Sequence, residues 1–282
     1  MSWILPYLLL WAALAASMTN FRFVWWFLMI LSVAAAVDAG IVEWAGLAAL
    51  AILAGACFAA VRAPGVLRAL AWAVVVILAA ALATNQVPGI HNIPVLDGVA
   101  VSASSADFTL FWNYDKGFAG ILLYAVFVQP QKKARWNRAI AVTGTVFILT
   151  LVSVAAAGTA MGYIAWDPKW PAILAVWVPS NLLLTCVSEE TFFRGILQRR
   201  ARRFLRGRVP SPALVALLVG AVAFGVVHAA GGAAYVLLAT LAGIGYGAAY
   251  HLTGRVEAGI AVHFLVNLSH LFLFTYPFAA AA

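Results

Sequence analysis

Two adjacent glutamates followed by an arginine are the residues of this chain whose types and spacing most clearly suit chemistry. In the stretch TCVSEETFFRGILQRRARR, Glu189 and Glu190 end an apolar run, and Arg194 follows the second glutamate by four residues. On a helix, Glu190 and Arg194 share a face at the spacing of an ion pair. Glu189 points about 100° away from that face, so we expect it to lack the arginine as a partner.

A carboxylate at low dielectric with no cation beside it holds a proton more tightly than one in water. A general base that works near neutrality needs this property, and we interpret Glu189 as such a base. The alternative is that both glutamates lie at a membrane interface and balance the basic residues that follow them.

Two further stretches carry polar groups in apolar surroundings. In AVAFGVVHAAGG, His228 follows Phe224 by one helical turn, although a lone histidine at a helix end is more often an interfacial or packing residue. In VEAGIAVHFLVNLSHLFLF, the spacing places His263, Asn267 and His270 on one side of a helix. Such a strip must face protein or water rather than lipid. Its alternative role is interhelical hydrogen bonding, at about 0.6–2 kcal/mol per contact.

The composition requires these residues to lie in or near a bilayer. Of the 282 residues, 65% are hydrophobic and only 9% are charged, which excludes an ordinary soluble domain. Ionisable groups inside a spanning helix cost about 2.5–3.5 kcal/mol each, so they are functional candidates by default. Those within or at the ends of apolar segments are Glu43, Glu189, Glu190, Arg194, His228, His251, His263 and His270.

Ten apolar segments predict an all-α, polytopic bundle of transmembrane helices. Because the first and fifth segments are short and could be re-entrant or interfacial, we expect eight to ten membrane segments. The first segment lacks a basic region before it, so we expect it to be retained rather than cleaved, with no soluble domain on either side of the membrane part. The ten segments cover residues 4–18, 23–38, 41–61, 66–84, 117–130, 140–160, 171–188, 211–230, 233–252 and 257–278.

Basic residues sort onto alternate connectors, as they do when lysine and arginine are retained in the cytoplasm. Arg22, Arg62, residues 132–138, residues 194–208 and Arg255 fall on the same side under the ten-segment count, which places both termini outside. The two basic exceptions are Lys116 and Lys169. Since the net charge of +8 lies in these connectors, it does not indicate a nucleic-acid partner.

One long connector lies within the N-terminal region. Residues 85–116 are rich in Pro, Gly, Asn and Asp, which favours turns over a spanning helix. We expect an outer loop with its aromatic residues at the headgroup level, serving as an interfacial loop or as a cap that touches substrate. We assign 1–170 to N-terminal transmembrane helices and 171–278 to a catalytic helix bundle.

The three polar stretches together resemble a known family. EETFFR, FGVVH and HFLVN match the ordered motifs Glu-Glu-x-x-x-Arg, Phe-x-x-x-His and His-x-x-x-Asn of the CPBP or Abi family, which includes CAAX prenyl endopeptidases. The resemblance covers about residues 175–275. It implies an intramembrane peptidase site assembled from these three stretches.

The resemblance also implies a role for each motif residue. Glu189 would activate water, and His228 would help to hold or activate that water. His263 and Asn267 would stabilise the oxyanion, while Glu190, Arg194 and Phe224 would support the site. His251 and His270 match no family position.

We expect no metal or other cofactor. A zinc site remains an alternative, because two histidines and a glutamate can bind zinc with one open position for water. However, the chain has no His-Glu-x-x-His spacing, and its ligands would come from three separate helices.

One conflict concerns the depth of the two histidines in the bilayer. If 211–230 crosses fully, His228 lies near the outer face, whereas His263 lies only about two turns from Arg255, so either tilt or deeper entry of these segments must bring the two together.

The sequence therefore predicts an intramembrane endopeptidase that uses glutamate-activated water on a peptide or membrane-anchored protein, near its C-terminus. We expect it in a bacterial plasma membrane, with the lipid bilayer as its surroundings; the oligomeric state stays open. The rival interpretation is a non-enzymatic transporter or immunity-type protein whose polar residues form a proton or substrate path. A transporter should show matched broken helices in two halves, whereas the polar residues here gather in the last third.

Overall fold

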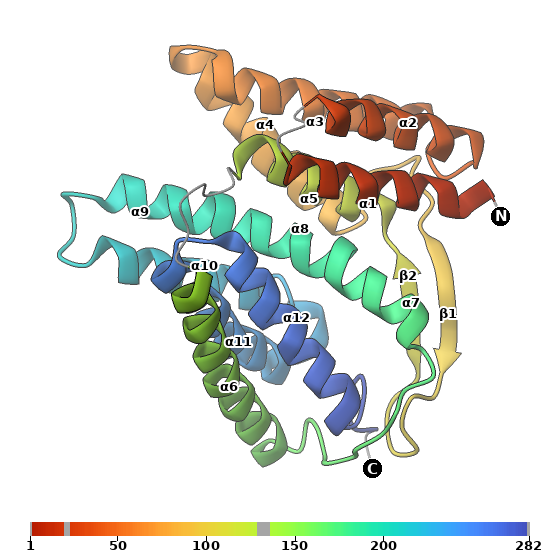
Figure 1. The fold of residues 1–282 in the computed structure, drawn as a ribbon, viewed down its shortest axis with the longest axis vertical. Helices are drawn as coiled ribbons and strands as arrows, with labels where there is room; N and C mark the ends of the chain where they lie inside the picture. Colours follow the sequence, from red (N-terminus) through yellow and green to blue (C-terminus); the bar gives the residue numbers. More distant parts are fainter. Residues whose placement is uncertain (1, 20–22, 129–135, 281–282) are drawn as a thin grey trace. The chain divides into compact units, whose positions relative to one another are not determined.

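A computed structural model describes residues 2–19, 23–128 and 136–280 of the chain (Figure 1). Every predicted apolar segment is helical, which confirms the all-α prediction. Arg22 and residues 132–135 of the charge pattern lie outside the described residues. The main helices are α1 (Leu5–Ser17), α2 (Val24–Asp38), α3 (Trp44–Arg62), α4 (Gly65–Ala83), α5 (Tyr114–Phe127), α6 (Trp136–Ala160), α7 (Leu174–Pro179), α8 (Val187–Glu190), α9 (Arg199–Leu205), α10 (Pro212–Val226), α11 (Gly232–Thr253) and α12 (Val256–Leu273).

The helices are those of an integral membrane protein. Among the described residues, five helices are long and apolar enough to cross a bilayer: α3, α4, α6, α12, and α11 together with the turn before it. The helices α1, α2 and α10 are apolar but shorter. With 15 residues, α10 is about 22 Å long, which is less than the roughly 30 Å of a hydrocarbon core. The count of eight to ten membrane segments stays a prediction.

The chain forms two compact units that interleave along the sequence. Unit 1 contains Met1–Val95, Phe111–Pro130 and Leu183–Glu189, and unit 2 contains Leu96–Leu110, Gln131–Leu182 and Glu190–Ala282. The boundary between Glu189 and Glu190 thus separates the two adjacent glutamates. The division at residue 170, which was drawn on the location of polar motifs, stays a prediction.

Unit 1 is built around α5, the short fifth segment. Most of the α5 side chains are buried, and α1, α3 and α4 pack against this helix. Polar side chains at its start are paired within the protein: Tyr114 shares a hydrogen bond with Ser32 at 2.9 Å, and the Tyr7 hydroxyl donates to the Trp112 carbonyl at 2.7 Å. Trp112 and Tyr114 are buried in the protein, and the expectation that the aromatic residues of the connector lie at the headgroup level stays a prediction.

The long connector contains regular structure that turn-forming residues did not predict. Strands β1 (Ile93–Val99) and β2 (Phe108–Trp112) form a two-stranded sheet. In unit 2, Phe108 and Leu110 pack on the cluster that contains Trp177 and Leu271. The connector is therefore anchored to the helices by apolar side chains.

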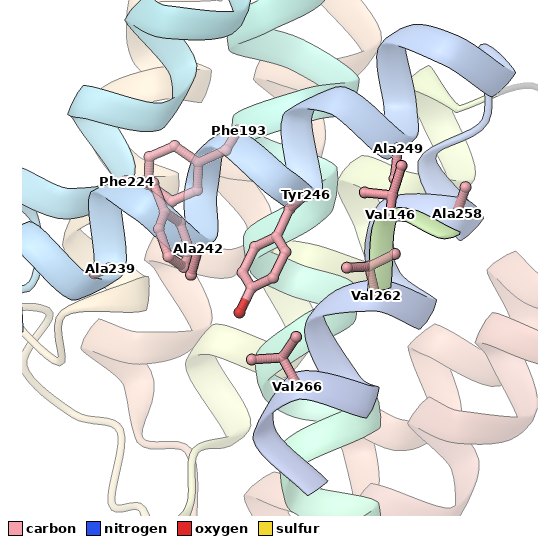
Figure 2. Close-up of a cluster of buried hydrophobic side chains, with 10 residues drawn as sticks. All are labelled: Val146, Phe193, Phe224, Ala239, Ala242, Tyr246, Ala249, Ala258, Val262 and Val266. Atoms are coloured by element: carbon pink, nitrogen blue, oxygen red, sulfur yellow. The ribbon is translucent and has the colours of Figure 1, made fainter. Parts of the chain in front are cut away.

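The core of unit 2 lies where α6, α10, α11 and α12 meet. Figure 2 shows large aromatic side chains, Phe193, Phe224 and Tyr246, packed among small aliphatic residues of α11 and α12. Small residues let the helix backbones approach closely. A Cβ at Gly243 of α11, for example, would lie 3.2 Å from the Cα of Ala221 on α10. This close packing positions the polar residues described below.

A glycine in α5 gives a direct test of the unit 1 packing. A Cβ at Gly120 would lie 2.0 Å from the Ser188 Oγ and 2.4 Å from its Cα, so backbone would have to move. We expect Gly120→Ala to destabilise the protein by about 1–3 kcal/mol or more, measured as thermal unfolding in detergent. The control is Gly55→Ala in α3, where a Cβ meets open space. Equal stability of the two variants would contradict the described packing.

Candidate active site

The paired glutamates lie on an irregular helical run. The short α8 that carries Glu189 and Glu190 is flanked by π-helical segments, Ser180–Cys186 and Thr191–Gln198. A π-helical turn holds more residues than an α-helical turn and so changes the direction of the following side chains; such turns are frequent at functional sites. The two glutamates lie next to each other in α8, where successive side chains point about 100° apart, and they reach different partners.

Glu190 and Arg194 form the predicted ion pair. Arg194 Nη1 donates to Glu190 Oε1 at 2.9 Å, and both side chains are fully buried. The other guanidinium nitrogen, Nη2, donates to the Gly243 carbonyl of α11 at 2.9 Å. The pair therefore fixes the π-helical segment against α11 as well as neutralising its own charges.

His263 joins this pair through the same carboxylate oxygen. Its Nδ1 lies 2.9 Å from Glu190 Oε1, and the histidine is 4% exposed. Because a carboxylate only accepts hydrogen bonds, the proton of this contact sits on Nδ1. The contact orients the ring, and Nε2 is the nitrogen that this contact does not use. A glycine makes room for it: a Cβ at Gly259, one turn before His263, would lie 2.9 Å from Glu190 Oε2.

Aromatic rings surround the charged groups. Tyr246 stacks on His263 with ring centroids 4.4 Å apart, and the Arg194 guanidinium lies 5.4 Å from the Tyr246 ring centre. Sequence reasoning missed Tyr246, which belongs to no polar motif. Its signal was a tyrosine set among glycines at positions 243, 245 and 247 of a close-packed helix.

Phe224 connects the three motif stretches. Its ring centre lies 4.9 Å from the Arg194 guanidinium, 5.6 Å from the His263 ring and 4.7 Å from the His228 ring. Both histidines therefore contact one aromatic ring, as a shared site requires. The helix α10 ends at Val226, before the end of the predicted segment 211–230.

His228 is held by its own helix. Its Nδ1 lies 2.6 Å from the Phe224 carbonyl oxygen, which can only accept. In the neutral ring, Nδ1 therefore carries the proton and Nε2 carries the lone pair. The edge of the ring also meets Tyr235, with centroids 5.3 Å apart. His228 is thus oriented with Nε2 as its basic nitrogen.

Asn267 lies one turn after His263 on α12. Its Nδ2 donates to Asn181 Oδ1 at 3.3 Å. Asn181 belongs to the first π-helical segment and was missed from the sequence, where a single asparagine eight residues before Glu189 gave no spacing to interpret. His270, further along α12, bonds the Thr275 carbonyl at 3.0 Å and so stays at the helix end. His251 is exposed.

Glu189 is paired, contrary to the expectation that it lacks a cation. Lys116 Nζ donates to Glu189 Oε1 at 2.6 Å, and the side chains are 14% and 13% exposed, respectively. Both residues belong to unit 1. Lys116 was one of the two lysines on the wrong side of the charge pattern. The other, Lys169, bonds Asp167 and the Phe274 carbonyl after the end of α12.

Metal ligands do not gather in the described part of the chain. Over residues 2–19, 23–128 and 136–280, no group of three His, Cys, Asp or Glu side chains is placed to hold a metal ion. The polar groups that do meet, Glu190, Arg194 and His263, are already bonded to one another. The expectation of a metal-independent site stays a prediction.

The buried ion pair can be tested by a double-mutant cycle. Arg194→Met should lower stability by about 3–5 kcal/mol, because it leaves Glu190 buried without its guanidinium. Adding Glu190→Gln removes the uncompensated charge, so the double variant should unfold at a higher temperature than Arg194→Met alone. Arg206→Met, at an exposed position, is the control and should change little. If the second substitution restores nothing, the charge of Glu190 is not what Arg194 balances.

One comparison with known proteins gives a match, and it covers this part of the chain. The family described as type II CAAX prenyl endopeptidase Rce1-like matches residues 170–269, a range that includes all three motif stretches. No curated protein and no solved structure matches the chain. The resemblance predicted from the motifs is confirmed: over residues 170–269, the chain is similar to the Rce1-like type II CAAX prenyl endopeptidases.

Proposed function

We propose that this protein is an intramembrane endopeptidase that hydrolyses a peptide bond of a membrane-associated substrate near its C-terminus. The observation that carries the proposal is the contact of the Phe224 ring with Arg194, His228 and His263. Three stretches far apart in sequence thereby meet at one place, within a segment similar to an endopeptidase family. A bacterial plasma membrane is the proposed location.

Glu189, rather than Glu190, is the proposed base. The Glu190 carboxylate is fully buried and bonded to Arg194 and His263, whereas the Glu189 side chain retains 13% exposure. Water can reach only a carboxylate with some exposed surface. Glu189 would take a proton from water as the water oxygen attacks the carbonyl carbon of the substrate. His228, with its lone pair on Nε2, is a second proposed acceptor for water, the role that the family resemblance implies for it.

His263 and Asn267 are the proposed oxyanion donors. As the carbon–oxygen double bond opens, charge develops on the carbonyl oxygen, and donors held in place stabilise it without reorganisation. Because Nδ1 already donates to Glu190, Nε2 can donate as well only when the imidazole carries a hydrogen on both nitrogens. When the tetrahedral intermediate collapses, the carbon–nitrogen bond breaks, and the leaving nitrogen takes the proton that Glu189 accepted from water. The products are a carboxylate and an amine.

The base is tested by hydrolysis in reconstituted liposomes. Peptides with a lipidated or apolar C-terminal region serve as substrates, and new C-termini are detected by mass spectrometry. Glu189→Gln should lower the rate by about 10²–10⁴-fold, and His263→Ala by about 10²–10³-fold. Glu43→Gln, which changes a glutamate side chain that is 64% exposed, should leave the rate unchanged. Full activity of Glu189→Gln would overturn the mechanism; a transporter would show substrate flux without new termini.

Metal dependence is tested in the same assay. Because the proposed steps use a carboxylate and hydrogen-bond donors, hydrolysis should persist after dialysis against EDTA and phenanthroline. A loss of activity that is restored by added zinc would instead support the zinc alternative, in which the metal activates the water. The recovery of hydrolysis on adding zinc should be measured with Glu189→Gln as the inactive control.

A further inference from the structure

We infer that Lys116 is the positioning residue of Glu189, keeping the carboxylate ionised and oriented so that it can act as a base. This inference rests on the proposed function, because it assigns Lys116 a part in the same site. Lys116 lies outside residues 170–269 and outside the three motifs. It contributes from α5, the central helix of unit 1.

The contact is short and sheltered. Lys116 Nζ lies 2.6 Å from Glu189 Oε1, a distance at the short end for a charged hydrogen bond. Both side chains are about six-sevenths buried, so solvent screens the interaction weakly. At low dielectric, a carboxylate with no cation nearby would take up a proton and lose its ability to accept one from water. A lysine at hydrogen-bond distance reverses this preference.

The backbone around Lys116 is built to reach α8. Ser188, the residue before Glu189, donates its hydroxyl to the Lys116 carbonyl at 3.0 Å. One turn further along α5, Gly120 lets the Ser188 backbone approach to a distance that no side chain would permit. A hydrogen bond to the Lys116 carbonyl and a close backbone approach at Gly120 thus bring the start of α5 to Ser188, the residue before Glu189. A surface ion pair formed by chance would not need either contact.

The start of α5 is fixed by a second set of bonds. Asp115 is 1% exposed, and its Oδ1 accepts from Asn92 Nδ2 at 3.0 Å and from the Lys116 backbone N–H at 2.8 Å. Asn92 Oδ1 in turn accepts from the Tyr114 N–H at 2.7 Å. Asp115, the acidic neighbour of Lys116, therefore already accepts hydrogen bonds from a backbone N–H and an amide side chain. The Lys116 ammonium group bonds Glu189 instead.

Other charged groups of unit 1 do not duplicate this role. In its described part, the remaining basic side chains are Arg62, Arg68 and His91. Arg68 Nε donates to the Ala63 carbonyl at the junction of α3 and α4, and His91 pairs with Glu43 on the surface. The helix α1 carries no charged residue. Lys116 is thus the basic group placed to set the charge of Glu189.

A labelling experiment tests the inference without relying on proteolysis. Dicyclohexylcarbodiimide reacts with protonated carboxyl groups in apolar surroundings, and labelled Glu189 is quantified by mass spectrometry of the purified protein at neutral pH. A cation within about 4–6 Å changes the proton affinity of a carboxyl group by about 10–1000-fold. Lys116→Met should therefore increase labelling by at least about tenfold, whereas Lys116→Arg should label like wild type.

The controls separate charge from structure. Lys169→Met removes a lysine of unit 2 and should leave Glu189 labelling unchanged, and Glu189→Gln should abolish it. If Lys116→Met does not fold, Lys116→Gln keeps a hydrogen-bond donor, removes the charge and should still raise labelling. Labelling of folded Lys116→Met or Lys116→Gln at the wild-type level would overturn the inference.

A parallel hydrolysis assay distinguishes this inference from the proposed function. Lys116→Met should lower kcat with little change in KM, and Lys116→Arg should restore most of kcat. Increased labelling in a protein for which wild type cleaves no substrate would support the ion pair and contradict the peptidase. Normal kcat in Lys116→Met, with wild type active, would contradict a positioning role.

Discussion

The fully buried carboxylate of Glu190 is the constraint on which the arrangement of unit 2 depends. A charge removed from water costs several kcal/mol unless partners compensate it closely. Arg194 and His263 supply that compensation at 2.9 Å each, and Arg194 also bonds the Gly243 carbonyl. The π-helical segment, α11 and α12 are thereby held at one point. The orientation of the His263 ring follows from its hydrogen bond to Glu190.

Burial gives two adjacent glutamates different properties. Glu190 is enclosed and bonded within unit 2, which suits a structural counter-ion, whereas Glu189 keeps some exposure and meets Lys116 within unit 1. The π-helical segments on either side of α8 accompany this divergence. In the account proposed above, one carboxylate orients a donor and the other activates water.

Sequence reasoning predicted the helices well because a bilayer requires long apolar segments, and each predicted segment is helical. It also predicted the Glu190–Arg194 pair, since spacing on one helix determines which side chains meet. Contacts between distant segments carry no such spacing. Lys116 with Glu189, Asn181 with Asn267, and Tyr246 with His263 could not be predicted for that reason. For Lys116, the available signal was that it and Lys169 violated the charge pattern; for Tyr246, it was the three glycines around it.

The central claim is that Glu189 acts as the base and that His263 and Asn267 donate to the substrate carbonyl oxygen. The most direct measurement is an experimental structure of the Glu189→Gln variant with an uncleaved peptide bound. We expect the scissile carbonyl oxygen about 3 Å from His263 Nε2 and from Asn267 Nδ2. A peptide bound with its carbonyl away from both donors would contradict the account.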